Sequence, residues 1–264
     1  MKMPVLFIGH GSPLNIILKN DFTRSLVALA KALPRPRSIL VISAHWLTDG
    51  TYVTSAERPQ TIYDFYGFPP ELYRLDYPSP GSPADAAWIT DLVKYPPVRG
   101  DDAWGLDHAS WAILKHLYPK ADIPVVEMSL DYSPSNGWNR KTLQSYYDLG
   151  RQLAPLREKG VLIIGSGNIV HNLRVVDMGH MDAAPFDWAV EFDERVKRLL
   201  LDRNHKELLD CRDASRATAL AVPTLDHYLP MILAIALQQK DDDLDFLYEG
   251  FQNRSVSMRC FTIG

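Results

Sequence analysis

Three histidines of this chain follow short apolar runs that are typical of buried strands. His10 and His45 come directly after such runs, and His171 comes a few residues after another. In open α/β sheets, ligands bind in the crevice outside the carboxyl ends of the strands. We therefore expect the three imidazoles to meet in one crevice, where they could bind a divalent metal ion.

Glycines surround two of these histidines, in Gly9-His10-Gly11 and in the segment 165–171. Because glycine has no Cβ, it lets the backbone approach a bound ion or substrate closely. Two further histidines, His108 and His227, lie near the predicted starts of helices and are candidates for the same site. The other three are expected to be structural or surface residues: His116, His180 and His205.

A set of histidine ligands limits which metals could bind but does not determine the reaction. Imidazole nitrogens suit zinc, iron, copper and nickel, and a set of three or four neutral ligands leaves an open coordination position, as catalytic sites do. A zinc hydrolase of a small ester or amide, a redox iron enzyme and a non-catalytic metal- or small-molecule-binding protein all remain compatible with the residues. The nucleophile elbow, the P-loop and the His-Glu-x-x-His signature are absent from the sequence.

Apolar runs alternate with amphipathic segments, which predicts an α/β fold, while the length of 264 residues fits one large domain as well as two small ones. We expect a central, largely parallel or mixed sheet flanked by helices, with the active site at the carboxyl ends of the strands. The predicted strands are 5–8, 38–43, 124–130 and 161–164, with an edge strand over 255–263, and the predicted helices are 21–33, 107–118, 142–159, 188–202 and 224–239.

Two other segments have a distinct composition. Residues 58–100 are rich in proline and aromatic residues, which predicts an ordered excursion over part of the carboxyl edge of the sheet, and the aromatic side chains from Tyr63 to Tyr77 could wall a pocket there. The acidic run from Asp241 to Asp245 predicts a solvated turn.

Composition excludes several classes of partner. The net charge is −4 over 264 residues, so there is no basic field for a nucleic acid. No apolar run reaches the roughly 18 residues of a membrane span, and we expect no membrane association. Cys211 and Cys260 match no zinc or redox spacing and fit a reducing cytoplasm. We expect a cytoplasmic protein that is a monomer or a small homo-oligomer.

Five motifs, in this order along the chain, resemble the 4,5-DOPA extradiol dioxygenase family. This family belongs to the class III extradiol dioxygenases and is related to the catalytic subunit of protocatechuate 4,5-dioxygenase. The resemblance extends from residue 4 to the end of the chain. The motifs are Gly9-His10-Gly11-Ser12-Pro13, Ser43-Ala44-His45-Trp46, Trp104-Gly105-Leu106-Asp107-His108, the segment Gly165 to Leu173, and His227-Tyr228-Leu229-Pro230.

The resemblance implies a single α/β domain over residues 1–264 and a non-haem Fe(II) enzyme, although bacterial members of the family often hold zinc when isolated. His10, His45 and His227 match the three metal ligands of the family. His171 matches a histidine that acts as acid and base and can also reach the ion, and His108 matches a histidine that faces the substrate.

The implied reaction is the ring cleavage of a catechol such as DOPA by O2, which gives a ring-opened semialdehyde. The zinc hydrolase is kept as the alternative function. One departure from the family pattern is visible, because Asp226 stands before His227 where a glutamate is expected. The shorter carboxylate could weaken a contact behind the ligand.

Overall fold

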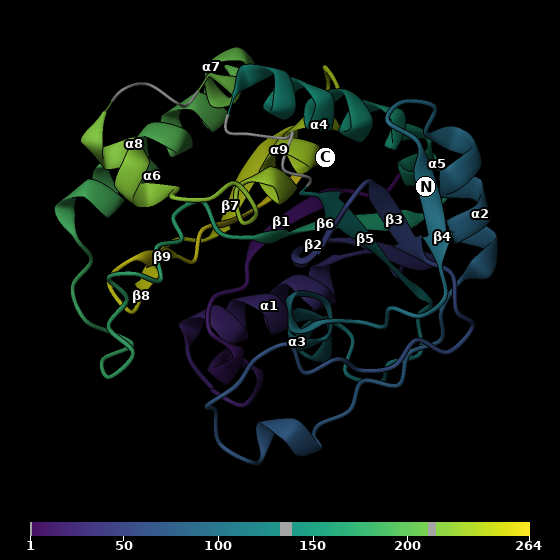
Figure 1. The fold of residues 1–264 in the computed structure, drawn as a ribbon, viewed down its shortest axis with the longest axis horizontal. Coiled ribbons are helices and arrows are strands. Elements are labelled where there is room, and N and C mark those ends of the chain that lie inside the picture. The colour runs from purple at the N-terminus through teal and green to yellow at the C-terminus, as the bar shows by residue number, and fades with distance from the viewer. Residues whose placement is uncertain (1, 133–138, 211–214) are drawn as a thin grey trace.

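The computed structural model describes residues 2–132, 139–210 and 215–264. In these residues, eight strands form one sheet in the order β4-β3-β5-β2-β6-β1-β10-β7 (Figure 1). Cys211 lies outside the described residues. The strands of the sheet are β1 (Val5–Gly9), β2 (Ser38–Thr48), β3 (Thr51–Thr54), β4 (Val98–Asp101), β5 (Val125–Asp131), β6 (Val161–Gly167), β7 (Leu244–Tyr248) and β10 (Cys260–Ile263).

The centre of the sheet is parallel, and strands of the opposite direction join it on both sides. β1 pairs with β6, β6 with β2, and β2 with β5, all in parallel. β10 and β7 extend the sheet beyond β1 in antiparallel pairing, and β3 pairs antiparallel to β5. The carboxyl ends of the four central strands therefore lie at the same edge. The predicted α/β fold with a mixed sheet is confirmed.

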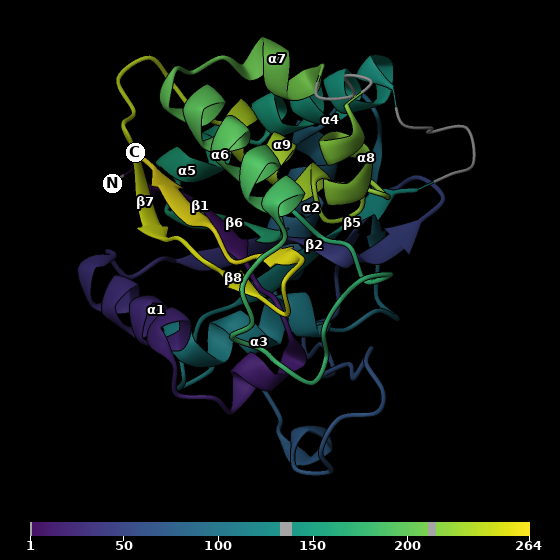
Figure 2. The same ribbon diagram turned by 90° about the vertical axis from the view of Figure 1, so that its left-hand side faces the viewer.

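Helices cover both faces of the sheet, with α1 and α3 on one side and α4, α6, α8 and α9 on the other (Figures 1 and 2). Side chains of β1 alternate between the two apolar cores, Val5 and Phe7 in one, Leu6 and Ile8 in the other. The helices are α1 (Asp21–Ala32), α2 (Pro83–Leu92), α3 (His108–Leu117), α4 (Arg140–Gln152), α5 (Ala154–Glu158), α6 (Asp187–Leu201), α7 (His205–Leu209), α8 (Arg216–Ala221) and α9 (Leu229–Ala236), with 3-10 turns at Pro13–Ile16 and Leu72–Arg74.

Two predicted helices differ from those in the structure because of proline. The segment 142–159 forms two helices, α4 and α5, and Pro155 lies in the first turn of α5, where its missing N–H costs nothing. The segment 224–239 is helical only over α9, which begins with Leu229 and Pro230. The residues before α9 form a turn instead, and this turn carries His227. None of the helices in the described ranges has the length and apolar character that a membrane span requires.

The segment 255–263 was expected to be one edge strand, and this prediction is wrong. Its first part forms β9 (Val256–Ser257), which pairs with β8 (Phe251–Gln252) in a separate small hairpin. Its second part, β10, lies between β1 and β7. β7 is the edge strand on this side of the sheet, and its residues are half buried or exposed.

The acidic run from Asp241 to Asp245 is only partly the solvated turn that was expected. Asp242 is buried, with 4% of its surface exposed. Its Oδ2 accepts a hydrogen bond of 2.6 Å from Nη1 of Arg157, a fully buried residue of α5, and its Oδ1 lies 2.6 Å from Nζ of Lys2. Arg157 also donates to the carbonyl oxygens of Met3, Leu237 and Ile263, so this ion pair ties the start of the chain to α9 and β10.

Replacing Asp242 by asparagine is expected to lower the free energy of unfolding at pH 7 by about 3 kcal/mol, because it leaves a buried guanidinium unpaired. Burial acts to raise the pKa of Asp242, but the hydrogen bonds from Arg157 and Lys2 outweigh it and lower the pKa from 3.8 to about 2. The stabilisation is therefore complete above the unfolded-state pKa and is lost as the pH falls through the folded-state pKa. Urea denaturation should show a smaller difference between variant and wild type at pH 3 than at pH 7.

The matched control is Asp241→Asn, at an exposed position of the same run. Equal stability of Asp242→Asn and Asp241→Asn at pH 7 would show that the buried ion pair does not stabilise the fold.

Candidate metal centre

Five of the eight histidines line one pocket of about 320 Å³. The structure thus brings together the three histidines that were expected to converge from strand ends, and it adds His108 and His227. The pocket is lined by His10, Gly11, Ser12, Pro13, His45, Asp64, Phe65, Tyr66, Phe68, His108, His171, Leu173, Val176, Met178, His227, Asn253 and Val256. The remaining histidines, His116, His180 and His205, lie outside this lining.

His10 and His45 are held by the central parallel strands. His10 follows β1 directly, and its backbone N–H donates to the carbonyl of Gly167 at the end of β6. His45 was expected to follow a strand that ends at residue 43, but it lies within β2, which continues to Thr48. The pairing of β2 with β5 shifts register between Ile42 and Leu47, so His45 lies in the irregular part of the strand.

The turn that carries His227 packs directly on the glycine-rich end of β6. The carbonyl oxygen of His227 accepts a hydrogen bond of 2.9 Å from the backbone N–H of Asn168. A Cβ on Gly167 would lie 2.3 Å from this oxygen, a distance that no side chain tolerates. Gly167 is therefore required for the approach of the His227 turn, and this is a different role from the close approach to an ion that the sequence suggested.

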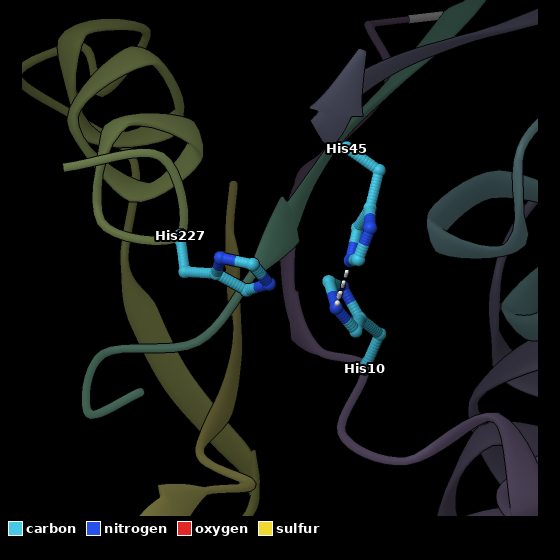
Figure 3. A group of neighbouring side chains, drawn as sticks. All are labelled: His10, His45 and His227. Carbon is cyan, nitrogen blue, oxygen red and sulfur yellow. Dashed lines mark hydrogen bonds between the residues drawn. The ribbon is translucent and has the colours of Figure 1, made fainter. Parts of the chain in front are cut away.

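His10, His45 and His227 point their rings toward one another (Figure 3). One nitrogen from each ring lies within 4.8 Å of the other two. Nε2 of His10 and Nε2 of His45 are 3.3 Å apart. Ligand nitrogens about 2 Å from one ion lie roughly 3 Å apart, so this spacing suits a shared metal.

Hydrogen bonding fixes the tautomer of His10. The hydroxyl of Ser166 donates its one proton to the carbonyl oxygen of Ala109 at 2.6 Å. In its contact of 3.0 Å with Nδ1 of His10, this hydroxyl must therefore accept. His10 carries its proton on Nδ1, and the Nε2 of the neutral ring presents a lone pair to the centre of the group.

Carboxylates impose the same tautomer on the other two rings. Nδ1 of His45 lies 3.1 Å from Oδ2 of Asp64, and Nδ1 of His227 lies 2.6 Å from Oδ2 of Asp226. The short side chain of Asp226 thus keeps its contact with the imidazole. Each neutral ring donates through Nδ1 and is left with a lone pair on Nε2.

This arrangement of the three Nε2 atoms is more favourable with a metal ion bound among them than without one. Nε2 of His227 is buried and has no hydrogen-bond partner among the described residues. Nε2 of His10 and Nε2 of His45 face each other at 3.3 Å, a contact that is repulsive unless a proton or a metal ion lies between them. Three convergent lone pairs with hydrogen-bonded Nδ1 atoms are the usual donor set of a histidine-bound metal.

Burial keeps two of the three rings in the form that binds metal. The pKa of His10 lies well below its ordinary value because of burial and of the neighbouring imidazoles, and burial also lowers the pKa of His227 against the opposing effect of Asp226. Burial acts to lower the pKa of His45 as well, but the hydrogen bond to Asp64 and nearby carboxylates outweigh it and raise the pKa. Neutral imidazole is the form that binds a metal.

His171 and His108 flank this group without belonging to it. The His171 ring stacks on His227, with centroids 3.5 Å apart and planes at 10°, and groups with Asp226 and His227 rather than with His10 and His45. The metal-ligand role expected for His171 therefore stays a prediction. His108 is the first residue of α3, and its ring centroid lies 4.1 Å from that of His45.

The aromatic segment forms part of the pocket wall. Phe65, Tyr66 and Phe68 line the pocket together with Leu173 and Met178, among others. The other aromatic residues of the segment pack elsewhere: Tyr63 lies against Trp111 and Tyr73, and Tyr77 is buried. Residues 58–100 also contain α2 and β4, so only part of this stretch is the irregular excursion that was expected.

Buried and half-buried carboxylates lie next to the histidines, and the sequence did not reveal them. Asp64 lies in the aromatic segment, where no periodicity marked it. Asp107 accepts a hydrogen bond of 2.6 Å from Ser43, and Glu127 of β5 accepts hydrogen bonds from Trp104 and from the backbone N–H of Asp107. Burial and the charge of Asp107 raise the pKa of Glu127 well above its ordinary value. The one signal available in the sequence was the position of Glu127 within an apolar strand. Glutamate side chains are rarely buried without a partner, so a buried one is unusual.

Known proteins match the chain over nearly its whole length. A family model described as the catalytic LigB subunit of aromatic ring-opening dioxygenase matches residues 5–258. The 4,5-DOPA dioxygenase extradiol of Escherichia coli (strain K12) is 43% identical over 267 residues, which cover 100% of this chain and 95% of the relative. The protein of the same name from Beta vulgaris is 34% identical over 257 residues, which cover 95% and 92%.

A solved structure shares the fold. The crystal structure of an uncharacterized protein from Escherichia coli K12 aligns with a TM-score of 0.82 and 39% sequence identity, over 100% of both chains.

Proposed function

Since the chain belongs to the LigB family of aromatic ring-opening dioxygenases, and is thus a metal-dependent extradiol dioxygenase, we propose that its five-histidine pocket is the site at which a catechol such as DOPA reacts with O2. The observation that carries this proposal is the convergence of three Nε2 atoms, from His10, His45 and His227, each on a ring whose Nδ1 is already hydrogen-bonded.

We assign His10, His45 and His227 as the metal ligands and Fe(II) as the working ion, with zinc as the ion that the isolated protein could hold. Bound Fe(II) would lower the pKa of the catechol hydroxyls and supply the electronic coupling between catechol and O2. Three protein ligands leave positions for both reactants.

His171 and His108 are then the groups that transfer protons. Burial and the neighbouring His227 lower the pKa of His171 well below its ordinary value, and burial and His45 lower that of His108. Both rings are therefore neutral at pH 7 and can accept a proton. We assign His171 as the base that takes a catechol proton and later returns it during ring cleavage, and His108 as a second group facing the substrate.

The pocket wall suits a flat aromatic ring. Phe65 and Phe68 contribute aromatic rings to the lining, and Val176 and Met178 add apolar surface, beside the five histidines and Asp64. This composition is typical of sites that bind small aromatic ligands. The product expected from cleavage beside one hydroxyl is a ring-opened semialdehyde that contains both atoms of O2.

Neither alternative is favoured by the comparisons. The matching relatives are named as dioxygenases, which speaks against a zinc hydrolase and against a non-catalytic binding protein. We further propose that residues 1–264 act as one catalytic domain in the cytoplasm, as a monomer or a small homo-oligomer.

The function is tested by loading the protein with Fe(II) under anaerobic conditions and then adding O2 and a panel of catechols that includes DOPA. We expect equimolar consumption of O2 and catechol together with the yellow absorbance of a semialdehyde. The zinc-loaded protein, assayed with esters and amides, is the control. Hydrolysis by the zinc form, without ring cleavage by the iron form, would contradict the proposal.

A further inference from the structure

One carboxylate outside the sheet contacts two of the five histidines. Asp64 belongs to the segment between β3 and α2. Its Oδ2 lies 2.7 Å from Nδ1 of His108 and 3.1 Å from Nδ1 of His45. Its Oδ1 accepts a hydrogen bond of 2.9 Å from the backbone N–H of His108. The Asp64 side chain is only 15% exposed, so these contacts are largely shielded from water.

These contacts define which nitrogen of each ring carries a proton. A carboxylate oxygen can only accept, so His45 and His108 must both donate through Nδ1. His45 then directs its Nε2 lone pair toward His10. His108 likewise has its lone pair on Nε2, the ring nitrogen that does not contact Asp64. Because one oxygen receives both bonds, the position of one ring also constrains the other.

We propose that Asp64 is a positioning residue that sets the metal ligand His45 and the proton-transfer residue His108 together. This inference rests on the proposed function, because it takes His45 as a ligand and His108 as a group that acts on the substrate. Asp64 itself touches neither the ion nor the reacting atoms in this assignment.

The backbone around Asp64 holds the carboxylate in place. The backbone N–H of Ile62 donates to the carbonyl of Leu106 at 2.8 Å, and the N–H of Leu106 donates to the carbonyl of Gln60 at 2.8 Å. The indole N–H of Trp111 on α3 donates to the carbonyl of Ile62 at 2.9 Å. The segment is thus joined to the chain on both sides of His108.

The same segment forms the substrate-side wall. Phe65, the residue after Asp64, lines the pocket and packs edge-on against His108, with ring centroids 5.6 Å apart. Asp64 therefore links the aromatic wall to the metal ligand and to the proton-transfer residue. A shift of the wall would move both histidines.

A second metal ion is the competing explanation, since one ligand atom from each of His45, Asp64 and His108 lies within 4.8 Å of the others. The separations of 2.7 and 3.1 Å between nitrogen and oxygen fit hydrogen bonds and also fit the spacing of two ligands on one ion, so the other contacts of Asp64 decide between the two. The backbone N–H of His108 also donates to the same carboxylate, as it would to an acceptor that stays in place. We therefore assign a hydrogen-bonding role to Asp64.

The test is Asp64→Asn, which keeps the shape of the side chain and removes its charge and one of its acceptor atoms. Removal of a carboxylate behind a ligating histidine typically costs 10- to 100-fold in metal affinity or activity. We expect chelator competition to show zinc binding weakened about 10-fold or more, with one equivalent still bound at saturation. At saturating Fe(II), kcat should fall about 10-fold or more, and KM for the catechol should change less than kcat.

Two further variants complete the test. Asp76→Asn makes the same change at an exposed position of the same segment, where the carboxylate accepts from Thr61, and should leave metal affinity unchanged. Asp64→Glu retains a carboxylate and should recover part of the affinity lost in Asp64→Asn. The visible spectrum of the Co(II)-substituted protein should shift in Asp64→Asn and stay unchanged in Asp76→Asn.

Wild-type zinc affinity and kcat in Asp64→Asn would overturn the inference, and so would the loss of a second bound equivalent of metal. If Asp64→Asn does not fold, the same comparison is made between Asp64→Glu and wild type, where unchanged metal affinity together with an unchanged cobalt spectrum would overturn it. Zinc affinity is measured without catechol. Failure of ring cleavage in the wild type would therefore contradict the proposed function and leave the affinity result to decide the role of Asp64.

Discussion

Replacing His45 by alanine is expected to strip the protein of stoichiometric metal and to abolish ring cleavage. The truncated side chain leaves one of three coordination positions empty, and the loss of a ligand costs more than the 10- to 100-fold caused by the loss of a supporting contact. It also leaves Asp64 without one of its two imidazole partners. Metal content after dialysis and oxygen uptake with a catechol measure the two effects.

The control for this variant is His205→Ala. His205 lies in α7, and its ring hydrogen-bonds to Tyr147 and Gln238, outside the pocket. This substitution should leave metal content and turnover unchanged. If His45→Ala keeps full metal at the wild-type affinity, the ligand assignment is wrong.

Replacing His171 by phenylalanine is expected to lower kcat by about 10² or more while the protein keeps its metal. Phenylalanine can retain the stacked contact that His171 makes with His227, at 3.5 Å between ring centroids, but it cannot exchange a proton. Steady-state kinetics at saturating Fe(II), together with metal analysis of the same samples, separate the two possible roles.

Loss of metal in His171→Phe would make His171 a ligand, and unchanged turnover would remove it from the mechanism. His180→Phe makes the same exchange at a side chain that is 78% exposed and should have no effect on either quantity.

The strands that carry His10 and His45 were predictable because their signals are local. The apolar run before His10 and the glycine-rich turn before His171 mark the ends of β1 and β6, and the apolar run before His45 marks β2, although that strand continues past His45 to Thr48. Since such ends meet at one edge, convergence followed from the fold class. His227 had no such signal beyond its position near a helix start, and its role as the third ligand came only from the family resemblance.

The supporting carboxylates could not be predicted because their partners are distant along the chain. Asp64 reaches His45 and His108 from an irregular segment, and Asp242 pairs with an arginine 85 residues away. Composition places acidic side chains at the surface by default. Only the folded structure shows which carboxylates are buried and which side chains each one contacts.

The most direct test of the ligand assignment is anomalous diffraction at the iron absorption edge, from crystals of the Fe(II)-loaded protein. We expect one strong peak about 2 Å from the Nε2 atoms of His10, His45 and His227. A peak at the His45, Asp64 and His108 group instead, or full loading with no peak among the three Nε2 atoms, would contradict it.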